Sequence, residues 1–224
     1  MTLPPTAGPV APAHAAATVG RDMTVLRLLF VCTGNICRSP SAEYLLRQRL
    51  AERLGEAAQR FEIGSAGVGT PGGWELDPKI GELFARHRIG GGDAFRSRRL
   101  DAALLADADL VLTGTKQHRL TIGADFPDAY SRTFTMREAA ALLATPETAS
   151  LPTTDLVERG RAAVALLQRS RSTRALSDDE LDVADPHGRR SSAYRTMFRE
   201  VETVVDVLSF VLAPAALRGR RVPA

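Results

Sequence analysis

Hydrophobic positions along this chain form two patterns, which are short, mainly apolar runs and longer amphipathic stretches. Residues 25–31, VLRLLFV, form the first run and stop at a glycine-containing turn, which predicts a buried strand of a parallel sheet. Pro40 suits a first helical turn, and apolar residues then repeat every four positions. This repeat predicts an amphipathic helix whose apolar stripe consists of Ala42, Leu46, Leu50 and Leu54.

The same alternation continues to the end of the chain. Further strands are predicted at 61–65, 110–113 and 133–135. Helices are predicted after Asp77-Pro78, after the capping residues Asp101 and Thr115, at 136–144, and in a long final stretch whose apolar positions are Tyr194, Phe198, Val201, Val205, Leu208 and Leu212. We therefore expect a three-layer α/β fold, in which a four-stranded parallel sheet is flanked by helices.

The ends of the chain and one internal stretch differ from this pattern. Residues 24–213 are interpreted as one domain, 1–23 as a disordered leader without the charged start of a secretory signal, and 214–224 as a loose tail. Residues 145–183 begin with prolines and show a single helical pattern, so we interpret them as an insertion, either a surface lid or a decorated loop. The apolar run at 204–217 is interrupted and too short to cross a bilayer, which argues against membrane insertion.

Composition narrows the class of protein further. The net charge is +3, but charges of both signs alternate and only 5% of residues are aromatic, which argues against nucleic-acid binding. The two cysteines, Cys32 and Cys37, cannot form a secreted disulfide scaffold, so a reducing, cytoplasmic location is expected. No metal-ligand cluster is recognisable in the sequence, and nothing in it indicates an oligomeric state.

The most informative segment lies between the first predicted strand and the first predicted helix, where Cys32 and Arg38 are six positions apart. Arg is abundant in this chain, so the spacing alone is weak evidence. A tight loop entering a helix, however, turns successive N–H groups inward, and together with the helix dipole they form an anion site. We therefore predict a phosphate loop at residues 32–39, with phosphate held by Thr33, Gly34, Asn35, Ile36, Cys37, Arg38 and Ser39.

Each residue type in this loop suits phosphate chemistry. Gly34 and Asn35 tolerate left-handed backbone conformations, and the planar fork of Arg38 can hold two phosphate oxygens. The same positive field favours the thiolate form of Cys32, which makes it the candidate nucleophile rather than an inert buried thiol. Cys37 is either a small space-filling residue or a redox guard that forms a reversible disulfide with Cys32. Attack of a thiolate on phosphorus needs no metal or organic cofactor, because the loop and Arg38 stabilise the charge.

Residues 31–43, VCTGNICRSPSAE, resemble the signature of the low-molecular-weight protein tyrosine phosphatases. Weaker similarity extends through residues 65–67, 109–112 and 134–138 and through Asp185-Pro186 before the last helix. The resemblance implies that Cys32 attacks phosphorus and that Arg38 and the loop amides hold the oxygens. It further implies that Ser39 bonds the thiolate and that Asn35 with Ser65 braces the loop.

In that family, an aspartate that precedes a proline protonates the leaving oxygen, and the resemblance assigns this role to Asp185. Asp-Pro is also ordinary turn chemistry and recurs at Asp77-Pro78, but Asp185 has the family's position before the final helix. Two residues depart from the family pattern, since His187 replaces a tyrosine and Phe95 a histidine. Trp74 either lines the substrate slot or is a core or surface anchor.

The resemblance implies hydrolysis of phosphotyrosine, in proteins or aryl phosphate monoesters, with a tyrosine-phosphorylated protein as partner. An arsenate reductase would need further cysteines outside the loop, and this chain has none. A protein arginine phosphatase typically carries Thr where this chain has Ile36. A phosphate-binding module without catalysis is the alternative of another class, and the joint presence of Cys32, Arg38, Ser39 and Asp185 argues against it.

Overall fold

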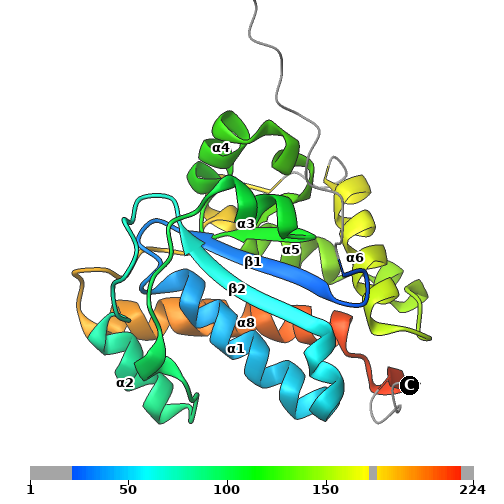
Figure 1. The fold of residues 1–224 in the computed structure, drawn as a ribbon, viewed down its shortest axis with the longest axis horizontal. Helices are drawn as coiled ribbons and strands as arrows, with labels where there is room; N and C mark the ends of the chain where they lie inside the picture. Colours follow the sequence, from blue (N-terminus) through cyan, green and yellow to red (C-terminus); the bar gives the residue numbers. More distant parts are fainter. Residues whose placement is uncertain (1–21, 172–175, 218–224) are drawn as a thin grey trace, which may run out of the picture.

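The structure is a computed structural model that describes residues 22–171 and 176–217, and its centre is a four-stranded parallel sheet (Figure 1). The strands are β1 (Leu26–Cys32), β2 (Phe61–Gly67), β3 (Leu110–Thr113) and β4 (Thr133–Thr135), in the spatial order β2-β1-β3-β4. All neighbouring pairs are parallel, so the predicted sheet is confirmed. The predicted leader and loose tail lie mostly outside the described residues, at 1–21 and 218–224.

Eight α-helices are present in the described part of the chain. Their bounds are α1 (Arg38–Leu54), α2 (Pro78–Arg86), α3 (Ala102–Asp107), α4 (Lys116–Asp125), α5 (Met136–Leu143), α6 (Leu156–Ser170), α7 (Asp178–Leu181) and α8 (Ser191–Leu212). Asp101 and Thr115 accept backbone N–H bonds at the starts of α3 and α4, as predicted. The four-residue helix α7 was not predicted, because one helical turn is too short to show a period.

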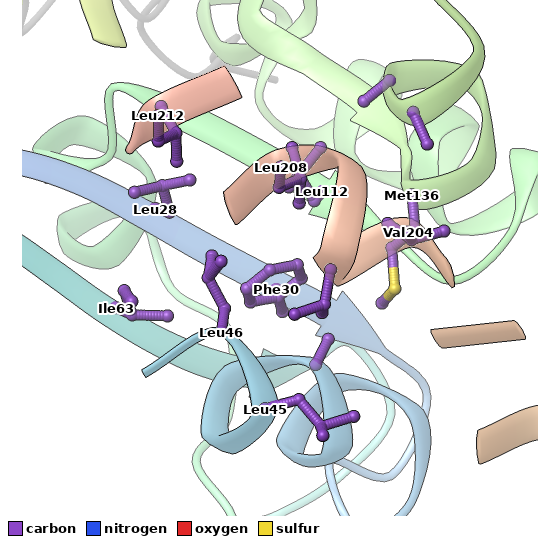
Figure 2. Close-up of a cluster of buried hydrophobic side chains, with 14 of the residues drawn as sticks. Leu28, Phe30, Leu45, Leu46, Ile63, Leu112, Met136, Val204, Leu208 and Leu212 are labelled. Atoms are coloured by element: carbon purple, nitrogen blue, oxygen red, sulfur yellow. The ribbon is translucent and has the colours of Figure 1, made fainter. Parts of the chain in front are cut away.

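The two faces of the sheet pack against different helices, which gives three layers. Alternate residues of β1 point to opposite faces, so Leu28 and Phe30 join the larger core whereas Leu29 and Val31 join the smaller one. Helices α1, α2, α5, α6 and α8 contribute to the larger core, and α3 and α4 to the smaller. Figure 2 shows Phe30 enclosed by side chains of α1 and α8. Full burial of such a side chain contributes roughly 1.5–3 kcal/mol.

Residues 145–183, interpreted as an insertion, contribute to the larger core through α6. Leu156, Val157 and Leu167 are buried there, and a methyl group on Gly160 would lie 2.4 Å from Leu26 of β1. The buried guanidinium of Arg159 donates to main-chain oxygens of the preceding turn and to Val211 at the end of α8. Helix α6 is therefore part of the packed domain rather than a surface lid or a decorated loop. That the segment is an insertion stays a prediction.

Cys32, the last residue of β1, lies at the carboxyl edge of the sheet, where Val31 pairs with Thr113 of β3 and Cys32 with Gly67 of β2. Ligands of open parallel sheets bind at this edge. Among the described residues, none of the helices is both long and apolar enough to span a membrane.

Candidate active site

The predicted phosphate loop connects the end of β1 at Cys32 to the start of α1 at Arg38. Asn35 has a φ of 53°, so the loop contains a left-handed residue, as Asn tolerates. Gly34, which was expected to share this conformation, does not have a positive φ. The loop therefore curls at Asn35 and enters the amino end of a 17-residue helix, whose dipole favours an anion.

A chain of hydrogen bonds joins the buried residues of the loop. The Asn35 side-chain amide donates to Ser39 Oγ at 2.9 Å and to Ser65 Oγ at 2.8 Å. Because an amide nitrogen only donates, the hydroxyl proton of Ser39 is free for another acceptor. Cys32 Sγ lies 3.0 Å from Ser39 Oγ, closer than the Ala66 carbonyl at 3.4 Å. The Ser39 hydroxyl can therefore stabilise a Cys32 thiolate.

Neighbouring segments hold this chain of hydrogen bonds from outside the loop. Arg98 donates its backbone N–H to Asn35 Oδ1 at 2.8 Å, and Ser65 donates its hydroxyl to the buried Glu43 carboxylate. Burial raises the pKa of Glu43, which Arg47 and the Ser65 hydroxyl counteract. Gly67 allows the close approach of β2, since a methyl group there would lie 2.5 Å from the Thr33 carbonyl oxygen. The loop is thus fixed by β2, α1 and the 95–99 segment together.

The Arg38 side chain is only 5% exposed and contacts the loop that carries Asp185. Its Nη2 lies 2.9 Å from Asp185 Oδ2, and its Nη1 donates to the Val183 carbonyl at 3.4 Å. Its Nε is buried and has no hydrogen-bond partner among the described residues. Buried polar groups are almost always paired, so this donor fits an anion bound in the loop.

The structure brings Asp185 to this site and gives the other Asp-Pro aspartate a different role. Asp185 lies on the segment of residues 183–190, called here the Asp185 loop, and its side chain is half exposed. Asp77 caps α2 by accepting from Lys79 N, and it also accepts the Tyr194 hydroxyl at 2.7 Å. Of these two carboxylates, Asp185 is therefore the one that pairs with Arg38.

His118 of α4 belongs to the same site and was missed in the sequence. Its Nδ1 lies 2.8 Å from Thr115 Oγ1 and its Nε2 2.9 Å from Thr33 Oγ1. When Thr115 donates its hydroxyl proton to Nδ1, the Nε2–H of the neutral ring donates to Thr33 Oγ1. Burial and the positive charge of Arg38 lower the pKa of His118 to about 4, so the ring is neutral at pH 7.

This geometry agrees with the comparison of the chain with known proteins. The sequence profile of the family described as low molecular weight phosphotyrosine protein phosphatase matches residues 27–141, which include β1, the phosphate loop and the sheet. The chain belongs to this phosphatase family. The similarity predicted from residues 31–43 is thereby confirmed.

Individual relatives of this phosphatase include both tyrosine phosphatases and arginine phosphatases. A probable low molecular weight protein-tyrosine-phosphatase, EpsP, of Ralstonia solanacearum is 35% identical over 111 residues, which cover 50% of this chain and 70% of that protein. A protein-arginine-phosphatase of Bacillus subtilis is 38% identical over 112 residues, with the same coverage. The solved structure of the arginine phosphatase YwlE from Geobacillus stearothermophilus aligns with a TM-score of 0.60 at 28% identity, covering 88% of this chain and 99% of that one.

The structure gives positions for the two residues that depart from the family pattern, His187 and Phe95, and for Trp74. His187 lies on the Asp185 loop with Nδ1 3.3 Å from Asp77 Oδ2, and Phe95 is buried against the Tyr44 ring. Trp74 is 47% exposed and lies beside the phosphate loop, since a methyl group on Gly34 would be 3.9 Å from its Cζ3 atom. Trp74 therefore lies at the mouth of the loop and not in the core.

Cys37, the residue before α1, is 3% exposed and belongs to the larger core. Burial, with the nearby Asp77 carboxylate, raises the pKa of its thiol. Both cysteines are free in this structure. The redox role of Cys37 stays a prediction.

Proposed function

We propose that this chain hydrolyses phosphotyrosine in proteins through a phosphocysteine intermediate at Cys32. The observation that carries the proposal is the contact of Ser39 Oγ with Cys32 Sγ at 3.0 Å, inside a loop braced by Asn35 and Ser65. A hydroxyl that can donate its proton to sulfur stabilises the thiolate, which is the nucleophilic form. Membership of the phosphatase family supports the same chemistry.

In the first step, the Cys32 thiolate attacks phosphorus, so that a phosphorus–sulfur bond forms and the ester phosphorus–oxygen bond breaks. Asp185 gives its proton to the departing tyrosine oxygen, which leaves as a neutral phenol. Arg38 and the backbone N–H groups of residues 33–39 hold the three remaining oxygens, where negative charge is spread in the transition state. The buried Nε of Arg38, which has no hydrogen-bond partner in the described part of the chain, supports this assignment.

In the second step, water attacks the phosphocysteine, and the Asp185 carboxylate accepts a proton from that water. The phosphorus–sulfur bond breaks, inorganic phosphate leaves, and the Cys32 thiolate is restored. Asp185 thus alternates between acid and base, which requires it to stay close to the reacting atoms. Its 2.9 Å contact with Arg38 supports this placement.

Phosphoarginine is a second candidate substrate, because two of the relatives named above are arginine phosphatases. The wall of the site favours phosphotyrosine, since Ile36 is partly buried and apolar and the exposed Trp74 ring lies on the same side of Gly34. An aromatic ring stacks and buries apolar area against such a wall, whereas a phosphorylated guanidine requires polar partners. We therefore place phosphotyrosine first.

The deciding experiment compares phosphotyrosine and phosphoarginine peptides of the same sequence, with phosphoserine as a third arm. We expect the highest kcat/KM on phosphotyrosine, and we expect acid-quenched enzyme to carry phosphate on Cys32 by mass spectrometry. Ile36→Thr should shift the ratio toward phosphoarginine. Turnover without a phosphocysteine would contradict the mechanism, whereas a higher kcat/KM on phosphoarginine would change only the proposed substrate.

The cytoplasmic location expected from the two free cysteines stays part of this proposal.

A further inference from the structure

Three possible metal ligands from separate segments meet beside the phosphate loop. Cys37 Sγ, a carboxylate oxygen of Asp77 and Nδ1 of His187 all lie within 4.8 Å of one another. Cys37 immediately precedes α1, Asp77 caps α2, and His187 belongs to the Asp185 loop. The backbone N–H of Asp77 donates to the Ile36 carbonyl at 3.1 Å, which holds the carboxylate next to Cys37.

We propose that Cys37, Asp77 and His187 form a site for a divalent zinc-like cation, whose binding restrains the Asp185 loop. A thiolate, an imidazole nitrogen and a carboxylate oxygen form a donor set that Zn²⁺ binds, and three protein ligands leave its fourth position to water. Binding of the metal ion requires the Cys37 thiol to release its proton to solvent. The site does not depend on the proposed phosphatase activity.

The separation of the histidine and carboxylate ligands suits tetrahedral coordination. Zinc bonds of about 2.0–2.1 Å to nitrogen and oxygen place two such ligands about 3.3 Å apart. His187 Nδ1 and Asp77 Oδ2 are 3.3 Å apart. The His187 side chain is 63% exposed, so it can approach the cation from the solvent side while the other two ligands stay in place.

Surrounding groups orient the carboxylate and balance the charge. Tyr194 donates its hydroxyl to Asp77 Oδ2 at 2.7 Å and Lys79 donates its N–H to Oδ1, which are the kind of outer contacts that fix a ligand. One Zn²⁺ with one thiolate and one carboxylate has no net charge, so a thiolate buried at Cys37 would be compensated. Because His187 follows Asp185 by two residues, its coordination would restrain the loop that carries Asp185.

The chain offers a matched control in a second histidine–carboxylate pair. His87 Nδ1 and Glu202 Oε1 are also 3.3 Å apart, and the His87 side chain is 38% exposed. Among the described residues, this pair is not part of any group of three possible ligands. A cation that binds any histidine–carboxylate pair would therefore bind at both places with similar affinity.

The test measures metal binding in the Cys32→Ser background, so that the metal cannot bind the proposed nucleophile. Titration of the full chain with Zn²⁺ should show one tight equivalent, and Co²⁺ should give a thiolate-to-metal charge-transfer band. Adding Cys37→Ala should remove the band and weaken binding at least ~100-fold, and His187→Gln should weaken it ~10–100-fold. Adding His87→Gln should leave the affinity unchanged.

Binding should also slow amide hydrogen exchange across residues 183–190, which a cation bound elsewhere would not do. Loss of all binding in Cys32→Ser itself, or equal affinity in His187→Gln, would overturn the site. Because His187 is exposed, its substitution tests the proposal even if Cys37→Ala fails to fold. Intact binding without slower exchange would overturn the restraint of the Asp185 loop.

Discussion

Asn35 and Ser39, inside the phosphate loop, are fully buried, whereas Asp185 and His187, on the loop that faces it, are exposed. The first loop is bonded to β2, α1 and the 95–99 segment through side chains and backbone. The Asp185 loop is bonded near both ends, where Val183 N donates to the Gly114 carbonyl at 2.8 Å and Lys79 Nζ donates to the Arg189 carbonyl at 2.7 Å. Arg38 contacts both loops.

The difference matches two physical demands of the proposed reaction. Stabilising charge on a transferring phosphoryl group requires donors that do not reorganise during the reaction, which a buried hydrogen-bonded loop provides. A proton donor must instead meet each leaving group and then allow product to leave, which an exposed loop permits. Substitutions in the two loops should therefore have distinguishable effects on activity and stability.

The largest effect is expected for Cys32→Ser, which removes the nucleophile and keeps the loop. Turnover should fall at least ~10⁴-fold on every substrate, because no phosphocysteine can form. Inorganic phosphate should still bind, since Arg38 and the loop amides remain. Steady-state kinetics and calorimetric titration with phosphate measure the two quantities. Activity near that of the unmodified chain would refute Cys32 as the nucleophile.

Substitution of Asp185 tests the role of the exposed loop. Asp185→Asn should lower kcat by ~10²–10⁴-fold on phosphotyrosine, and much less on an aryl phosphate whose leaving group needs no proton. The melting temperature should barely change, because the side chain is half exposed. Asp77→Asn, assayed without added metal, is the control at the other Asp-Pro, and its effect should show no dependence on the leaving group. Equal losses on both substrates in Asp185→Asn would indicate a structural role.

Arg38→Lys tests the residue that both loops share. We expect a loss of at least ~10²-fold in kcat on all substrates, because an ammonium group cannot reproduce the planar two-bond contact with phosphate. Unlike Asp185→Asn, this loss should not depend on the leaving group, and phosphate affinity should fall with it. A mild, substrate-dependent effect would mean that Arg38 serves mainly to hold Asp185.

The sheet, most of its helices and the phosphate loop could be predicted because each has a local signal. Apolar runs define β1 and β3, four-residue spacing defines α1, and Cys32 and Arg38 flank a loop between them. The bracing contacts have no such signal, since Arg98 uses its backbone N–H, which any residue has. His118 lies 85 positions from Thr33, so only the pairing of β1 with β3 brings them together.

Asn35→Ala removes the side chain that braces the buried phosphate loop. It removes the hydrogen bonds to Ser39 and Ser65 and the acceptor for Arg98, so kcat should fall roughly 10²-fold at ~1 kcal/mol for each of the three lost bonds. Because Asn35 has a φ of 53°, alanine there adds strain of about 1 kcal/mol. Asn35→Gly loses the same bonds without the strain.

The two Asn35 variants should therefore share the loss in kcat, while Asn35→Ala unfolds at a lower denaturant concentration. Chemical denaturation and kinetics on one aryl phosphate separate the two contributions. A stability loss without a kcat loss in either variant would show that the brace is not needed for catalysis.

The smallest catalytic effect is expected for His118→Gln, which tests the contact of α4 with Thr33 at the rim of the phosphate loop. Loss of one neutral hydrogen bond of about 0.5–1.5 kcal/mol should lower kcat by roughly two- to tenfold.

The pH dependence of the free energy of unfolding should change more clearly than kcat when His118 is replaced. The pKa of His118 is lowered to about 4, whereas a histidine in the unfolded chain has a pKa of about 6.5. As pH falls through 6.5, the unfolded chain therefore binds a proton that the folded chain does not, and stability is lost until about pH 4.

Between pH 7 and pH 5 this difference amounts to about 2 kcal/mol in the free energy of unfolding, since each pKa unit corresponds to 1.36 kcal/mol. Urea denaturation should show that His118→Gln loses about 2 kcal/mol less than the unmodified chain over this range. If His118→Gln and the unmodified chain lose stability in parallel, His118 is not the buried neutral histidine that its contacts with Thr33 and Thr115 indicate.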